Sequence, residues 1–287
     1  MGSKMRFVLT LAVVFCFGPV FARDVQVGLG GRHYLIDLPL HPSGAMIVAL
    51  HAAARSAEDL RDTTGLSPRA LAKGYAVIYP QATGTAKHAS WNGLYCCGDA
   101  QIDRVDDIGF LDKVIADAAA RFGLDPARVY LTGMSNGAVM AETYAVRRVW
   151  RVKAVAGVAG TVDLVRAPAT RVPLLHIHGT DDKMVPYADG YGTKHLGYAF
   201  TPVAVEIAAF VAAFGGLHAT SQRIGRGKGG TYVIEDDYTN GAGQTQVRLL
   251  TVVGGQHVWP EPGRMGQGNT QDISATDEIL RFFAQHP

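Results

Sequence analysis

The chain has 287 residues, of which 48% are hydrophobic and 18% charged, and its formal net charge at neutral pH is +2. This length and composition are typical of one large globular domain and exclude a disordered chain. The near-neutral charge gives no reason to expect nucleic acid or an anionic membrane as a partner, and we expect a monomer.

The N-terminus, residues 1–22, has the pattern of a secretory signal peptide. Two basic residues precede an apolar run at residues 7–17, and small or β-branched residues stand one and three positions before Arg23. The apolar run is short for a membrane span. We therefore expect cleavage before Arg23, a single catalytic domain over residues 23–287, and a secreted or periplasmic location.

Short apolar runs alternate with amphipathic segments along the rest of the chain. Runs of strand length that are apolar throughout predict strands buried on both faces, and apolar residues at helical spacing predict covering helices. The predicted strands are residues 25–27, 33–38, 45–50, 76–79, 129–132, 153–158, 174–178, 231–238 and 246–253. The predicted helices follow Ser56 and Gly137 and occupy residues 106–122, 203–214 and 274–283. This order predicts an α/β fold with a mostly parallel sheet covered on both faces, whose ligands bind beyond the carboxyl ends of the strands.

The stretch Val129–Gly137 contains the pentapeptide Gly-Met-Ser-Asn-Gly between a predicted strand and a predicted helix. A strand, a sharp turn and a helix are the context in which this pattern presents a nucleophilic serine. Glycine is expected at positions 133 and 137 because a Cβ there would collide with the helix backbone. A chain with 34 glycines can produce the pattern by chance, but the flanking elements favour Ser135 as a nucleophile.

A serine nucleophile needs a histidine base within hydrogen-bond reach and a carboxylate that orients this base. In this fold type the chain order is serine, acid, histidine. Asp182 lies 47 residues after Ser135, and His257 lies 75 residues after Asp182, each just beyond a predicted strand. Asp181 is the weaker candidate for the acid, because it could cap the turn or face solvent.

Backbone N–H groups must stabilise the negative oxygen that forms when the serine attacks an ester. We expect one from Asn136, directly after the nucleophile at a helix N-terminus, and one from Ala53, in the loop after the strand at residues 45–50. These two amides form the predicted oxyanion hole.

His176 and His178 lie two positions apart on a predicted strand and therefore share one face, as a pair of metal ligands could. The sequence offers no third ligand at a suitable spacing. We interpret them as packed histidines near the acid loop, and we expect no metal and no cofactor.

A long loop at residues 81–104 leaves the same edge of the sheet as Ser135, and loops of this length are usually functional. It carries Trp91, whose flat face suits an aromatic acyl group or a sugar ring. We expect Trp91 to bind substrate, together with Trp259, which follows His257 and could form a wall of the cleft. The alternative for Trp91 is a core position beneath the loop.

The same loop carries the adjacent residues Cys96 and Cys97. An oxidising compartment favours a vicinal disulfide between them. The alternative is two free thiols packed under the loop.

Several motifs follow one another along nearly the whole mature chain. They are Ser90-Trp91-Asn92 followed by Cys96-Cys97-Gly98, then Val105–Phe110, Arg128–Gly137, His178–Asp182 with Val185-Pro186-Tyr187, and Gly254–Pro260. Together they resemble the secreted polyhydroxybutyrate depolymerase and feruloyl esterase family of α/β-hydrolases. The resemblance implies that Ser135, Asp182 and His257 form the triad, and its His-Gly-Thr-x-Asp pattern favours Asp182 over Asp181. Members usually carry His-Gly where this chain has His51-Ala52, which adds a methyl group to the predicted oxyanion loop.

The resemblance implies an exported serine esterase that works through an acyl-enzyme. Its substrates would be feruloyl or acetyl esters of polysaccharide, or hydroxyalkanoate esters. The sequence shows no separate substrate-binding module, which favours soluble oligosaccharide esters or short oligoesters. The alternatives are a serine peptidase, because the same triad cleaves amides, and a non-catalytic binding protein on the same scaffold.

Overall fold

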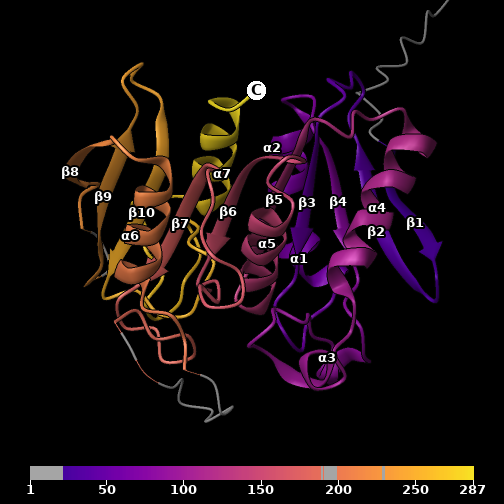
Figure 1. Ribbon diagram of the computed structural model, residues 1–287, viewed down its shortest axis with the longest axis horizontal. Helices are drawn as coiled ribbons and strands as arrows, with labels where there is room; N and C mark the ends of the chain where they lie inside the picture. Colours follow the sequence, from indigo (N-terminus) through magenta and orange to yellow (C-terminus); the bar gives the residue numbers. More distant parts are fainter. Residues whose placement is uncertain (1–21, 189, 191–198, 228–229) are drawn as a thin grey trace, which may run out of the picture.

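The architecture comes from a computed structural model, which describes residues 22–188, 190, 199–227 and 230–287 (Figure 1). Ten strands in this part of the chain form one sheet, in the order β1-β2-β4-β3-β5-β6-β7-β10-β9-β8. The strands are β1 (Ala22–Leu29), β2 (Arg32–Leu38), β3 (Met46–Leu50), β4 (Ala76–Pro80), β5 (Val129–Met134), β6 (Val152–Val158), β7 (Leu174–Gly179), β8 (His218–Ile224), β9 (Tyr232–Thr239) and β10 (Thr245–Val253).

The six central strands, from β4 to β10 in the sheet order, run parallel to one another. Antiparallel strands continue the sheet at both margins, with β2 and β1 on one side and β9 and β8 on the other. The mostly parallel sheet predicted from the apolar runs is therefore confirmed. Since the central strands are parallel, the loops that follow them emerge at one edge of the sheet.

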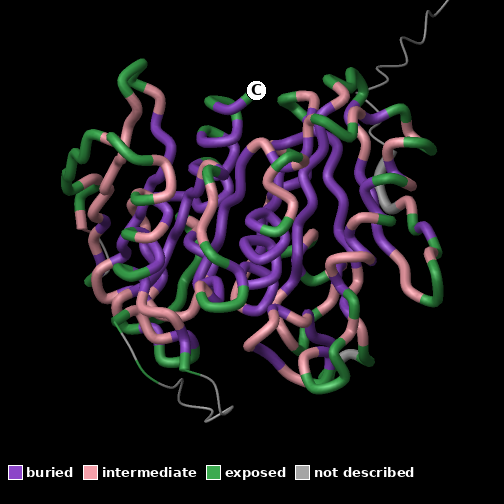
Figure 2. Tube along the Cα trace, in the orientation of Figure 1, coloured by how far each residue is buried: buried purple, intermediate pink, exposed green. Residues whose placement is uncertain are grey.

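Helices cover both faces of this sheet (Figure 1). They are α1 (Ala57–Thr64), α2 (Leu66–Leu71), α3 (Gly98–Ile102), α4 (Asp107–Phe122), α5 (Asn136–Arg147), α6 (Val203–Phe214) and α7 (Ala275–Ala284), with a short 3-10 turn at Ala86–His88. Helices α4, α5 and α6 contribute to the apolar cluster on one face, and α1, α2 and α7 to the cluster on the other. Figure 2 shows the result, a central sheet that is buried along most of its length.

Local sequence signals explain where the helices begin and end. Ser56 and Asp59 form the expected capping box at the start of α1, each side chain bonded to the other's backbone N–H. Helix α4 begins after Asp106, which accepts a hydrogen bond from Gly109 N–H, and ends at Gly123 in the left-handed conformation. These caps define the start of α1 and both ends of α4.

Three parts of the chain depart from the predicted pattern or lie beyond it. Helix α3 and the 3-10 turn lie within residues 81–104, which were predicted as one loop. Strand β8 was not predicted, because it is exposed and polar along almost its whole length and shows no apolar alternation. The predicted signal peptide lies outside the described residues except for Ala22, the first residue of β1. In the described ranges we find no helix with the length and apolarity that crossing a membrane requires.

Candidate active site

Ser135 lies at the sharp turn between β5 and α5, with φ 56° and ψ −127°, a strained conformation for a residue with a side chain. A Cβ on Gly133 would overlap the carbonyl group of Gly137, on the following helix. A Cβ on Gly137 would overlap the backbone oxygens of Leu50 and His51, so this glycine is required by the end of β3 and not, as predicted, by the helix. The turn therefore needs both glycines, and it presses the start of α5 against the neighbouring strand.

Asp182 and His257 are in direct contact at the ends of β7 and β10. The distance from His257 Nδ1 to Asp182 Oδ2 is 2.7 Å, and Asp182 Oδ1 accepts hydrogen bonds from the backbone N–H groups of Met184 (2.8 Å) and Val185 (2.9 Å). Asp182 is buried, whereas the neighbouring Asp181 is exposed. The structure therefore pairs His257 with Asp182, the carboxylate favoured by the sequence.

The environment of Asp182 favours its ionised form. Burial acts to raise the pKa of this carboxyl, but hydrogen bonds and charge interactions with His178 and His257 outweigh burial and hold the pKa far below its ordinary value. Asp182 is therefore a carboxylate throughout the neutral pH range. A carboxylate in this position makes His257 Nδ1 the donor and leaves Nε2 as the nitrogen that can accept a proton.

Backbone hydrogen bonds join the loops that carry these residues. Ser135 N–H donates to Val158 O at the end of β6 (2.8 Å). Asp181 N–H donates to Gly255 O in the loop that carries His257 (2.8 Å). The strands concerned are neighbours in the order β5-β6-β7-β10, so the loops meet along one edge of the sheet. The predicted nucleophile, base and orienting acid are thereby brought to the same edge.

The two predicted oxyanion donors belong to neighbouring strand ends. Asn136 is the first residue of α5, and Ala53 lies in the loop that follows β3, the strand paired with β5. The side chain of Asn136 makes two hydrogen bonds to the backbone of Trp91, one to its N–H (2.7 Å) and one to its carbonyl (2.9 Å). These two hydrogen bonds fix Asn136 against the loop at residues 81–104.

Trp91 does not form a wall of the cleft, and the prediction that it binds substrate is wrong. It is fully buried in the apolar cluster, its Nε1–H donates to His51 O (3.0 Å), and its ring lies 5.4 Å from that of His51. An indole can satisfy its N–H and bury its large apolar surface together in such a position. Trp91 therefore lies in the core and supports the loop after β3, and the core position was the alternative left open by the sequence.

The prediction for Trp259 is wrong for the same reason. Its side chain is 5% exposed and packs in the cluster on the opposite face of the sheet, and its Nε1–H donates to Thr276 Oγ1 of α7 (3.2 Å). Trp259 thus anchors the chain that leaves the histidine loop and offers no surface to a ligand.

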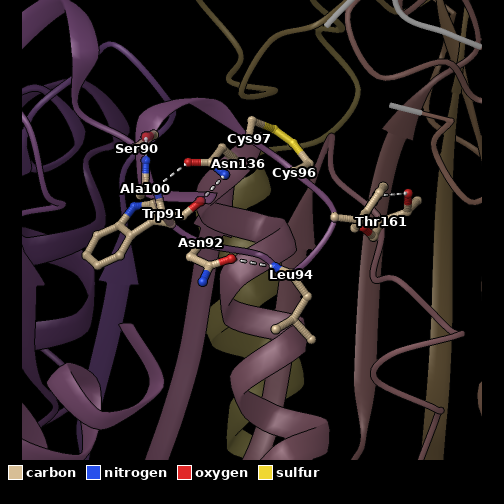
Figure 3. Close-up of a disulfide and its surroundings, with 10 residues drawn as sticks. Ser90, Trp91, Asn92, Leu94, Cys96, Cys97, Ala100, Asn136 and Thr161 are labelled. Atoms are coloured by element: carbon tan, nitrogen blue, oxygen red, sulfur yellow. Dashed lines mark hydrogen bonds between the residues drawn. A yellow bond between two sulfur atoms is a disulfide. The ribbon is translucent and has the colours of Figure 1, made fainter. Parts of the chain in front are cut away.

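Cys96 and Cys97 are joined by a disulfide, and their peptide bond is cis (Figure 3). Both residues are buried, and they pack in a small apolar cluster with Val185 of the acid loop and Phe200. The hydroxyl of Tyr95 donates to Thr161 O (2.6 Å), in the loop after β6. The disulfide segment thus ties the loop at residues 81–104 to the acid loop.

Part of the polar surroundings of Asp182 could not be predicted from the sequence. His178 Nε2 lies 2.9 Å from Val185 O and 3.4 Å from Asp182 Oδ2, and His176 lies behind His178. Both histidines are packed in the core near the acid loop, as interpreted, but Glu142 and Glu206 join them there. The ligand-type atoms of Glu142, His176 and Glu206 lie within 4.8 Å of one another, close enough to share a cation. These glutamates come from two helices 64 residues apart in sequence, and no local spacing connects them to the histidines.

The chain is similar in sequence to proteins that are named as esterases. The model of the family described as Esterase PHB depolymerase matches residues 37–190, just over half of the chain. NocK of Nocardia uniformis subsp. tsuyamanensis, which is named as an esterase, is 29% identical over 91% of this chain and 81% of its own length. Feruloyl esterase B of Piromyces equi is 27% identical over 54% of this chain, and the match spans 29% of that longer protein.

Two further matches are to proteins named as acetyl xylan esterases. The bifunctional acetylxylan esterase/xylanase XynS20E of Neocallimastix patriciarum is 24% identical over 55% of this chain and 22% of its own length. The solved structure of an acetyl xylan esterase from Aspergillus awamori superposes with a TM-score of 0.61, covering 91% of this chain and 98% of that one at 13% identity. At this identity the likeness shows the fold alone, and it confirms the α/β-hydrolase architecture.

Proposed function

The chain belongs to the esterase PHB depolymerase family and is a carboxylic ester hydrolase, and we propose that it works through an acyl-enzyme on Ser135. The observation that carries this proposal is the 2.7 Å contact between His257 and the buried Asp182, at the same sheet edge as a serine in a strained turn. This contact supports the roles of His257 as base and Asp182 as its orienting acid.

In the proposed reaction the Ser135 oxygen attacks the ester carbonyl carbon while His257 Nε2 takes the hydroxyl proton. The N–H groups of Asn136 and Ala53 stabilise the resulting oxyanion. The C–O bond to the alcohol then breaks, and His257 returns the proton to the leaving alkoxide. A water molecule, deprotonated by His257, attacks the acyl carbon. The bond to the Ser135 oxygen then breaks, His257 returns the proton to this oxygen, and the acid is released. Asp182 holds His257 in the correct tautomer and stabilises its charged form throughout.

We propose soluble oligosaccharide esters with acetyl or feruloyl groups, or short hydroxyalkanoate esters, as the substrates. The names of the relatives support this class, since they act on acetylxylan or feruloyl esters according to their names. We further propose that the protein acts as a monomer outside the cytoplasm. The signal-like N-terminus and the disulfide both support an oxidising location.

The test combines a probe of the nucleophile with a substrate panel. A fluorophosphonate probe should label the wild-type protein and leave Ser135→Ala unlabelled, since an unactivated serine does not react. Rates on p-nitrophenyl acetate, methyl ferulate, hydroxybutyrate oligomers and a peptide panel should then rank the substrates. Labelling without ester turnover, or turnover of peptides above esters, would contradict the proposal.

A further inference from the structure

Behind Asp182, four titratable side chains continue from the acid loop into the core. His178 and His176 lie on β7, Glu142 on α5 and Glu206 on α6, and each is 0–1% exposed. The two helices pack on the same face of the sheet (Figure 1). Side chains of this kind are rarely buried without partners, so the position of each hydrogen in this group can be worked out.

The direction of the hydrogen bonds is fixed from one end. Val185 O can only accept, so His178 Nε2, 2.9 Å away, must carry a hydrogen. In a neutral imidazole His178 Nδ1 is then a lone pair, and its 3.0 Å contact makes His176 Nε2 the donor. His176 Nδ1 must therefore also be a lone pair. Burial lowers the pKa of His176 to about 4, which agrees with a neutral ring at pH 7.

This lone pair faces two carboxyl groups. His176 Nδ1 lies 3.3 Å from Glu142 Oε1 and 3.2 Å from Glu206 Oε2. Glu206 Oε1 accepts a hydrogen bond from Val162 N–H (2.7 Å), whereas the second oxygen of each carboxyl lacks a well-formed hydrogen bond. Three acceptors that face one another in a dry core repel unless a positive hydrogen or a metal ion lies between them.

The properties of the carboxyl pair favour a proton. Burial raises the pKa of Glu142 to about 8 and that of Glu206 well above its ordinary value. The charged or titratable groups facing the pair are His176 and, across the loop after β6, Tyr95, whose hydroxyl donates to Thr161 O. Neither supplies a positive charge, so a neutral carboxyl costs less than two buried carboxylates.

We propose that Glu142 and Glu206 hold a shared proton at neutral pH that is donated to His176 Nδ1, and that this proton fixes His178 as a second N–H donor to the triad carboxylate Asp182. Glu142, Glu206, His176 and His178 are thus positioning residues that act through Asp182. The inference rests on the proposed function of Asp182 for its effect on catalysis, but the hydrogen positions can be measured without any activity.

The first experiment locates the hydrogens. Ring nitrogen NMR on Ser135→Ala protein labelled with ¹⁵N-histidine should show His176 and His178 as Nε2–H tautomers at neutral pH, and elemental analysis should find no stoichiometric metal. An imidazolium at His176, an Nδ1–H tautomer at His178, or one equivalent of a divalent metal would each overturn the proposal. Activity of Ser135→Ala would overturn the proposed function instead, and leave these signals unaffected.

The second experiment tests the connection to catalysis. In Glu206→Gln the amide oxygen can still accept from Val162 N–H while the amide NH₂ donates to His176, so kcat should stay within about threefold of wild type. Glu206→Leu removes the acceptor and the donor, and one lost hydrogen bond is worth roughly tenfold in kcat with little change in KM. The His178 tautomer signal should be kept in the Gln variant and altered in the Leu variant. Equal losses in both variants, with the tautomer unchanged, would exclude the positioning role.

Discussion

Two groups of loops at the carboxyl edge of the sheet differ in what they do with their side chains. The loops after β5, β7 and β10 carry Ser135, Asp182 and His257 at this edge, and the serine and the histidine remain partly exposed. The loop at residues 81–104 turns its indole inward, where Trp91 is fully buried. A long polar loop beside an active site is therefore not by itself a binding surface. The positions of the groups that accept its hydrogen bonds decide whether such a loop contacts a ligand or supports the residues that do.

An ion pair and the hydrogen bonds of its two partners support the loop at residues 81–104. Asp107 at the start of α4 binds Arg32 through one carboxylate oxygen (2.6 Å) and accepts the N–H of Asn92 with the other (2.7 Å). The Arg32 guanidinium lies 3.5 Å from the ring centroid of Phe110 and 5.2 Å from that of Trp91. The charges of Arg32 and Asp107 are therefore paired. We expect the loop at residues 81–104 to contribute to stability, and the loops after β5, β7 and β10 to contribute to turnover.

The largest expected effect is on turnover and comes from the first group of loops. Ser135→Ala removes the nucleophile, and loss of the serine in a comparable triad costs about 10⁶-fold in kcat. The melting temperature should stay within a few degrees, because the side chain is small and partly exposed. Ester hydrolysis and thermal unfolding measure the two quantities. Retention of more than a few per cent of wild-type kcat would show that another residue is the nucleophile.

The next effect separates two adjacent carboxylates of the acid loop. Asp182→Asn would offer an amide N–H to His257 and hold it in the wrong tautomer, at a cost of about 10⁴-fold in kcat. Asp181 is exposed, and its carboxylate contacts Thr180 Oγ1 at 3.3 Å, so Asp181→Asn should change kcat less than threefold. The two variants form a matched pair for kinetics on one ester. The opposite ranking would assign the orienting role to Asp181.

These residues show what sequence could and could not predict. The strands, the turn at Ser135 and the choice of Asp182 could be predicted, because apolar runs, turn glycines and the His-Gly-Thr-x-Asp pattern each lie within a few adjacent residues. Trp91 was misplaced because its partner, His51 O, lies 40 residues away and leaves no local trace. Glu142 and Glu206 were missed for the same reason, since a helix position alone does not reveal which strand side chain it faces.

The third prediction concerns the loop at residues 81–104, where a substitution should change stability more than substrate specificity. Trp91→Ala removes a fully buried indole and should lower the free energy of unfolding by about 3–5 kcal/mol. Trp91→Phe is the matched control, which keeps a ring but leaves His51 O without its donor, at a cost of about 1–3 kcal/mol. Urea unfolding gives these energies. KM for methyl ferulate and KM for p-nitrophenyl acetate should change alike. A rise in KM for methyl ferulate alone, with unchanged stability, would show that Trp91 binds substrate.

The smallest expected effect is a pH dependence at His51, which joins the loop after β3 to the loop at residues 81–104. The ring is buried, its Nδ1–H donates to Ala52 O (2.8 Å), and its Nε2 accepts Ala82 N–H (3.0 Å), so both nitrogens are used by a neutral imidazole. Burial, assisted by the charge of Arg32, lowers the pKa of His51 to about 4.

Because this pKa lies below the unfolded value of about 6.5, the unfolded chain binds the extra proton first. The stability that His51 contributes is therefore complete above pH 6.5 and is lost as the pH falls toward 4, by about 2 kcal/mol at pH 5. His51→Gln does not titrate and can still accept the Ala82 N–H through its amide oxygen. Its free energy of unfolding should accordingly fall less between pH 7.5 and pH 5 than that of the wild type, by about this amount. Since His176 and His286 also have lowered pKa values and remain in both proteins, the difference between the two curves isolates His51. Parallel curves would show that the ring can be protonated in place, and that Ala82 and the oxyanion loop do not depend on its neutral form.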